Sequence, residues 1–189
     1  MDGNNLNEDI LILIFNNKTK KMKLSKKIIL LLITILTTAF VNAQDKPKSS
    51  AEKATGVING ATIQINYGSP SVRGRQIWGG LVPYNEVWRA GANDATTFET
   101  DKDITIEGSK LPAGKYSFFI IPNKTESIIV FNKEAKQWGA YKYKEKDDQL
   151  RVTVKQQMAD PITEKLVYKI NANDVVLSWD NWNIGFKVN

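Results

Sequence analysis

The sequence contains no cysteine and no histidine. Without histidine, the chain lacks the commonest general base at neutral pH and the usual Ser-His-Asp arrangement for nucleophilic catalysis. Without either residue, nearly every zinc or other transition-metal site is excluded, and no disulfide can stabilise the fold. We therefore expect no metal and no cofactor, and we assign no catalytic residue. Any catalysis would depend on carboxylates, lysine, tyrosine or serine.

The chain also has little excess charge of one sign. Residues 44–189 carry 20 basic and 17 acidic side chains, a net charge of +3. This excess is small and is not gathered into a basic stripe, so we expect no nucleic-acid partner. With 42% apolar and 24% charged residues in 189, the composition is that of one globular domain with a hydrophobic core.

Long apolar runs are scarce, and the longest lies near the amino terminus. The basic "MKLSKK" at 22–27, the apolar "IILLLITILTTAF" at 28–40 and the small-residue site "VNA" at 41–43 have the pattern of a secretory signal peptide. The apolar run is shorter than the roughly 20 residues that span a bilayer, which favours cleavage over anchoring. We expect an exported protein, periplasmic or extracellular, without stable membrane insertion. Residues 1–21 are then an upstream extension, and a true start at Met22 would explain them.

Residues 44–56 are polar and predict a linker, whereas residues 57–189 predict a single β domain. Apolar side chains alternate with polar ones in "TIQINY", "DITIEG", "LRVTVK", "KLVYKI" and "NWNIGFKVN". The segment "KYSFFIIP" at 115–122 is apolar on both faces, which predicts a central strand. We expect an all-β fold, an antiparallel β-sandwich of which a jelly roll is one variant, although spacing alone leaves a barrel open.

One connection is too long for a simple turn. The stretch "SPSVRGRQIWGGLVPYNEVWRAGAN" at 69–93 lies between a strand ending near Tyr67 and one beginning near Thr96. Such loops are usually functional or compact Ω-type structures, so we expect one long ordered loop that carries a ligand site. The candidate ligand-binding residues are Arg73, Arg75, Trp78, Tyr84, Arg89, Asn93, Trp138 and Tyr141.

The arginines in this stretch have two interpretations. Guanidinium groups bind carboxylates or phosphates through paired hydrogen bonds, and they equally stitch a loop to acids such as Glu86, Asp94 or Glu99. We expect Trp78 to be exposed, because the flexible Gly79 and Gly80 follow it. Trp88 is expected to fill the core and, with Arg89, to anchor the loop.

Two further segments attract attention. In "QWGAYKYK" at 137–144, Trp138, Tyr141 and Tyr143 would form the far wall of the same groove, or else cap the edge of the sandwich, with Tyr141 and Tyr143 on one strand face and the lysines on the other. In "SWDNWN" at 178–183, oxygen-bearing side chains suggest a calcium loop, but the further acids that such a site needs are missing. We interpret this segment as a tight turn between strands.

The run "YGSPSVRGRQIWGGLVPYNEVWRAGANDATTFET", followed by "DITIEGSKLPAGKYSFFIIPN", "WGAYKYKEKDDQLRV" and "LSWDNWNIGFKV", resembles the bacterial family called domain of unknown function 2911. The resemblance covers almost all of residues 57–189. It implies an exported, mostly β domain and brings no established reaction.

Three function classes remain open from the sequence. The first is a ligand-binding module of the cell envelope, for carbohydrate or another anionic polymer, because arginine, tryptophan, tyrosine and asparagine together offer charge, stacking and amide hydrogen bonds. The second is a structural or protein-partner domain of the envelope. The third is a glycoside-active enzyme that uses a carboxylate pair, with Glu86 and Asp94 as candidates. The oligomeric state is not predicted.

Overall fold

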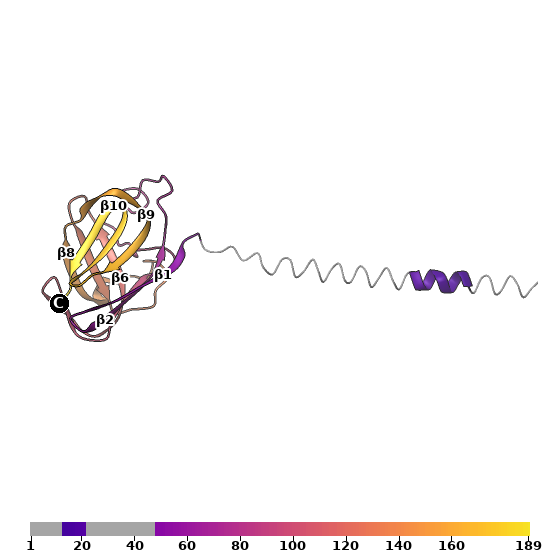
Figure 1. Ribbon diagram of the computed structural model, residues 1–189, viewed down its shortest axis with the longest axis horizontal. Helices are drawn as coiled ribbons and strands as arrows, with labels where there is room; N and C mark the ends of the chain where they lie inside the picture. The colour runs from indigo at the N-terminus through magenta and orange to yellow at the C-terminus, as the bar shows by residue number, and fades with distance from the viewer. Residues whose placement is uncertain (1–12, 22–47) are drawn as a thin grey trace, which may run out of the picture. The chain divides into compact units, whose positions relative to one another are not determined.

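The computed structural model describes residues 13–21 and 48–189 (Figure 1). The expected signal peptide, its cleavage site and residues 44–47 of the expected linker lie outside the described residues. Residues 13–21 are helical and belong to a unit separate from the β domain, which the structure describes from Lys48 onward. No helix within the described ranges is long and apolar enough to cross a membrane.

Alternating side chains give the domain its strands, as the sequence predicts. The strands are β1 (Ser50–Ile58), β2 (Ala61–Ser69), β3 (Thr96–Thr100), β4 (Ile104–Ile106), β5 (Ser109–Leu111), β6 (Gly114–Pro122), β7 (Ser127–Asn132), β8 (Asp148–Val154), β9 (Gln157–Ile170) and β10 (Asp174–Lys187). A short 3-10 helix, η1 (Glu145–Asp147), precedes β8.

The strands form two packed layers, so the predicted antiparallel β-sandwich is confirmed. One layer is a six-stranded antiparallel sheet in the order β1-β2-β3-β6-β7-β8. The other contains the β9–β10 hairpin, which Figure 1 shows laid over that sheet. Thr105 of β4 exchanges backbone hydrogen bonds with Asn189 just after β10, which adds the β4–β5 hairpin to this layer. Neighbouring strands of the large sheet follow chain order, as in a meander and unlike the Greek-key order of a jelly roll.

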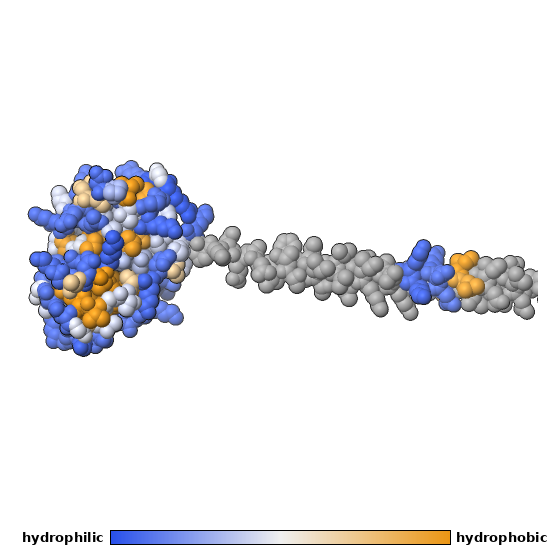
Figure 2. Space-filling view, in the orientation of Figure 1, coloured by the Kyte–Doolittle hydropathy of each residue, from blue (hydrophilic) through white to orange (hydrophobic). Residues whose placement is uncertain are grey.

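The main core lies between the layers. Ile63 and Ile65 of β2 and Phe118 of β6 face inward and meet Leu177 and Phe186 of β10. The central-strand prediction for residues 115–122 is confirmed, because β6 pairs with β3 and β7 and is buried on both faces. On its outer face, Phe119 packs in a smaller cluster with Val130 and Ala95. In Figure 2, the viewed face of this unit has apolar patches bordered by hydrophilic side chains.

The prediction of a linker over residues 50–56 is wrong. β1 pairs with β2 along its whole length, from Ser50 opposite Ser69 to Ile58 opposite Ala61. An edge strand in this position has only alternate residues facing the core, here Ala54, Gly56 and Ile58, so its composition stays polar. Backbone hydrogen bonds to β2, which composition does not reveal, make it a strand.

The segment at 178–183 is not a tight turn between strands. It lies inside β10, where the register against β9 shifts on both sides of Asp180, a residue with φ of 53°. Such β-bulges insert an extra residue and re-aim the side chains that follow. As a result, Trp179 before the bulge and Trp182 after it both face the core.

Candidate functional site

The loop at 70–95 is ordered because its backbone pairs with both layers in turn. Near its start, the Val72 N–H donates to the Glu164 carbonyl of β9 at 2.8 Å. Further on, Trp88 and Ile120 of β6 exchange two backbone hydrogen bonds, at 2.8 and 2.9 Å. This pairing takes up β6 after Phe118, the last β6 residue that pairs with β3. Each contact satisfies backbone groups that would otherwise be left unpaired. The prediction of one long ordered loop is therefore confirmed.

Inside this loop, residues 76–82 form a compact turn with a buried interior. Ile77, Trp78 and Val82 face the core, and Trp78 is only 6% exposed. Its ring stacks on Trp182 at 4.4 Å between centroids, with planes 11° apart. The expectation that Trp78 is exposed is wrong. The bulge in β10 directs Trp182 into the core, where it stacks on Trp78, and the sequence around Trp78 does not reveal this contact.

Four tryptophans meet at this end of the sandwich. Trp88 stacks on Trp179 at 5.7 Å and 16°, while Trp78 meets Trp88 edge-on at 5.7 Å. Tyr84 lies beyond, stacked on Trp182 at 6.1 Å. Trp88 is half-buried rather than a full core residue, although its backbone pairing does fasten the loop as expected. Tyr84 thus supports the cluster and does not line the cavity described below.

The carbonyl of Ala90 fixes the end of the loop. It accepts hydrogen bonds from the Tyr168 hydroxyl at 2.8 Å and from Thr96 Oγ1 at 3.0 Å. Ala90 itself has φ of 52°, a left-handed conformation that a non-glycine residue adopts only when its surroundings hold it. Burial raises the pKa of Tyr168 well above its usual value, so its hydroxyl remains a donor at neutral pH. These contacts position Arg89, the preceding residue.

Replacing Tyr168 with phenylalanine is expected to lower the free energy of unfolding by about 1–1.5 kcal/mol. The variant removes one donor from the buried Ala90 carbonyl and leaves the Thr96 bond in place. Urea unfolding measures the change. Tyr141→Phe is the matched control, since Tyr141 is 83% exposed and should show no loss. An equal stability for both variants would contradict the anchoring role of Tyr168.

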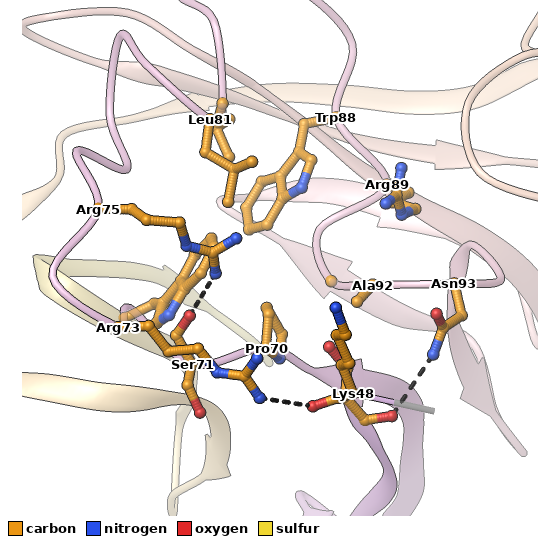
Figure 3. A pocket seen from close by; sticks show the side chains of 14 residues that line it. Lys48, Pro70, Ser71, Arg73, Arg75, Leu81, Trp88, Arg89, Ala92 and Asn93 are labelled. Carbon is orange, nitrogen blue, oxygen red and sulfur yellow. Dashed lines mark hydrogen bonds between the residues drawn. The ribbon is translucent and has the colours of Figure 1, made fainter. Parts of the chain in front are cut away.

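A cavity of about 310 Å³ lies beneath this loop (Figure 3). Four cationic side chains line it, and no carboxylate among the described residues does. Figure 3 shows Arg73 and Arg75 on one side, Arg89 on the opposite side and the Trp88 ring entering between them. The lining residues are Lys48, Ser49, Pro70, Ser71, Arg73, Arg75, Leu81, Val82, Trp88, Arg89, Gly91, Ala92, Asn93 and Trp179.

The guanidinium groups of Arg73 and Arg75 bond to backbone carbonyls, and the Arg73 backbone N–H donates to Glu164 Oε1 at 3.0 Å. Arg75 donates from Nε to the Val72 carbonyl at 3.0 Å and from a terminal nitrogen to the Ser71 carbonyl. Arg73 donates to the Lys48 carbonyl at 3.1 Å. Within residues 48–189, none of the four cations forms an ion pair with a carboxylate. Glu99 does not bind the arginines, because its carboxylate pairs with Lys115 at 3.4 Å.

Two buried donors at the cavity lack a partner among the described residues. They are Nε of Arg89 and the indole nitrogen of Trp179, a residue that is only 1% exposed. Both side chains line the cavity. Buried donors are normally satisfied, and an unmade hydrogen bond costs about 1–3 kcal/mol. An unpaired guanidinium nitrogen and an unpaired indole N–H are groups that a bound acceptor would satisfy.

A second, open hollow of about 1120 Å³ lies next to the cavity, and we call it the groove. Trp138, 62% exposed, lines the groove, and Asn93 lines both hollows. Trp138 therefore does not form the far wall of the cavity itself, and Tyr141 lines neither hollow. The expected strand face at 137–144 is also wrong, since these residues form an isolated bridge and turns. The lining residues of the groove are Ala51, Glu52, Lys53, Gln64, Asn66, Tyr67, Gly68, Ala92, Asn93, Asp94, Ala95, Thr97, Lys115 and Trp138.

Sequence reasoning missed three residues of the cavity: Lys48, Ser49 and Trp179. Lys48 and Ser49 directly precede β1, which the composition predicted to be a linker, so their neighbours in sequence gave no indication that they line a cavity. Trp179 lies in a segment that looked like a turn. The candidate carboxylate pair is not assembled in either hollow, because Asp94 lines the groove whereas Glu86 lines neither.

A family profile described as "Protein of unknown function (DUF2911)" matches residues 49–188. The matched range contains all ten strands and the whole 70–95 loop. No curated protein and no solved structure matches the chain.

Proposed function

We propose that this chain, which belongs to the DUF2911 family, is a ligand-binding module whose cavity holds an anionic ligand. The observation that carries the proposal is the lining of the cavity: four cations and no carboxylate among the described residues. Its volume of about 310 Å³ lies at the lower end of small-molecule sites, which are typically about 300–1,000 Å³.

Charge and geometry both favour an anion. Uncompensated cations around a concave surface create a positive potential that concentrates negatively charged ligands. Arg73 and Arg75 have already lost part of their conformational freedom through hydrogen bonds to carbonyls, so less entropy is lost when they bind. The half-buried Trp88 adds a flat apolar surface, which suits the carbon face of a sugar acid.

The place of action that we propose is the cell envelope. This part of the proposal rests on the basic, apolar and small-residue regions at 22–43, the pattern of a cleaved secretory signal. A periplasmic or extracellular protein meets acidic glycans and their fragments. Intact mass of the protein recovered from native cells tests it, since export and cleavage predict a chain that begins at Gln44. A chain that retains residues 28–40 would contradict it.

Removing one cavity arginine should weaken binding of a monomeric anion about tenfold or more, because each makes charge-assisted hydrogen bonds. The variants are Arg75→Ala and Arg89→Ala, measured by calorimetry on the full chain with galacturonate, glucose 6-phosphate and inorganic phosphate as probes. Affinity should fall as salt rises.

Lys110→Ala is the control for loss of a positive charge. Lys110 is exposed, pairs with Asp103 at 2.9 Å and lines neither hollow, so its loss should leave binding unchanged. If none of the three anions binds, or if all three variants weaken binding equally, the binding proposal fails and a structural or protein-partner role in the envelope takes its place.

A further inference from the structure

We infer that the ligand is an acidic oligosaccharide whose charged unit occupies the cavity and whose neutral units extend along the groove. This inference rests on the proposed function and goes beyond it, because it assigns the groove as a second subsite with its own chemistry.

The two hollows are neighbours with a common wall. Ala92 and Asn93 line both of them. On the cavity side, Arg89 extends toward the loop of Trp138: its Nη1 lies 3.7 Å from the point where a Cβ on Gly139 would stand. The cation that holds the acid and the exposed ring in the groove are therefore borne by adjoining segments, and a ligand longer than one unit can contact both.

The groove differs from the cavity in charge. Two acids, Glu52 and Asp94, and two lysines, Lys53 and Lys115, line it, so its charges balance. Between them, Gln64, Asn66 and Thr97 present amide and hydroxyl groups from the outer face of β2 and β3. Groups of this kind both donate and accept hydrogen bonds, as sugar hydroxyls require. The charge of a bound polymer would thus be neutralised at one end only.

Trp138 provides the groove with a stacking surface that is held in place. The preceding residue, Gln137, is buried, and its Nε2 donates to Asn132 Oδ1 at 3.1 Å and to the Glu134 carbonyl at 2.8 Å. The Gln137 carbonyl also accepts from the Ala95 N–H at 3.0 Å. An exposed ring on an anchored backbone is pre-organised, so binding loses little conformational entropy. Flat aromatic surfaces with polar neighbours suit pyranose rings.

Other polymers fit this surface less well. A nucleic acid would need cations along the whole path to neutralise each phosphate, whereas the uncompensated cations are confined to the cavity. A peptide that adds a strand would need a free sheet edge. The groove instead crosses the face of β1, β2, β3 and β6, as its lining residues Lys53, Gln64, Thr97 and Lys115 show.

The experiment measures the affinity of the full chain for acidic oligosaccharides of increasing length. The probes are hyaluronan fragments, in which charged and neutral units alternate, and oligogalacturonates and chondroitin sulfate fragments, in which the further units are also charged, all from disaccharide to hexasaccharide, with cello-oligosaccharides as neutral counterparts. We expect the hyaluronan series to gain about tenfold or more in affinity between disaccharide and tetrasaccharide, the more highly charged series to gain less, and the neutral series to bind at least tenfold more weakly. The carboxylate and sulfate series show which acid the cavity prefers.

Trp138→Ala should remove the gain with length and leave the affinity for the disaccharide unchanged. Arg89→Ala should weaken every length. Tyr141→Ala is the matched control, because Tyr141 is an exposed aromatic residue of the same loop that lines neither hollow. Trp138→Phe should retain part of the gain and reduce the fluorescence change caused by the longer probes to that caused by the disaccharide, which comes from Trp88 and Trp179 in the cavity.

The outcomes separate this inference from the proposed function. Affinity that does not rise with length, or a gain that survives Trp138→Ala, would overturn the oligosaccharide assignment, and so would tight binding of the neutral series. If monomeric anions bind in the cavity while no acidic series does, the assignment of the groove fails and the cavity proposal stands. If no anion of any length binds, both fail.

Discussion

Replacing Trp78 with alanine is expected to lower the free energy of unfolding by about 3–5 kcal/mol, the range for loss of a large buried aromatic side chain. Trp78 is 6% exposed and stacks on Trp182, and it meets the edges of Trp88 and Trp179 at 5.7 and 6.0 Å. Truncation would leave a cavity at the centre of this cluster. Urea unfolding followed by circular dichroism gives the change, and Trp78→Phe should cost less because it keeps part of the stacking.

Trp138→Ala is the control for removing a tryptophan. Trp138 is 62% exposed, so its truncation should change stability by about 0.5 kcal/mol or less. The two variants lose the same atoms and differ only in burial. Equal losses would contradict the arrangement in which Trp78 is packed in the tryptophan cluster and Trp138 is exposed.

Gly68→Ala is expected to cost about 2–3 kcal/mol and to weaken ligand binding as well. Gly68 lies in β2, where the 70–95 loop returns: the Ala92 N–H donates to the Gly68 carbonyl at 3.1 Å. A Cβ at this position would overlap the Ala92 carbonyl oxygen and stand 2.9 Å from its carbon. Backbone atoms cannot rotate away, so the loop must shift, and overpacking of this kind typically costs about 1–3 kcal/mol. Because Ala92 lines the cavity, the shift displaces the cavity wall.

Gly185→Ala is the matched control for this substitution. Gly185 also lies in a strand, β10, and the nearest atom to an added Cβ is Val176 Cγ2, at an ordinary 3.4 Å. We expect a change of at most about 1 kcal/mol, toward higher stability, since alanine restricts the unfolded chain. Thermal unfolding of both variants makes the comparison. If Gly68→Ala is as stable as Gly185→Ala, the loop is not packed against β2 as closely as described.

Much of the fold could be predicted because the signal for a strand is local. Alternation in residues 62–67 and 165–170 appears as half-buried strands, and the two-sided apolar pattern of residues 115–122 appears as the central strand β6. The 70–95 loop could be recognised from its length and its glycines and prolines. Its arginines could be named as candidates for an anionic site, and Arg73, Arg75 and Arg89 do line one cavity.

Other features had no local signal. β1 has the composition of a linker and becomes a strand only because β2 offers a free edge. Lys48 and Ser49 enter the cavity because of that pairing, so they could not be predicted either. The bulge at Asp180 requires knowledge of the register between β9 and β10. Each feature depends on a partner strand, and the sequence of one strand does not show which other strand it pairs with or in which register.

The sequence by itself therefore determined the class of the fold, the central strand and the long ordered loop that lines the cavity, because each depends on periodicity or composition within a short segment. Only the tertiary structure decided which tryptophan is buried. The glycines after Trp78 favoured exposure, yet Trp78 is buried because it stacks on Trp182 and meets the edges of Trp88 and Trp179. Burial is a property of what packs against a side chain, so a side chain's own neighbours in sequence do not determine it.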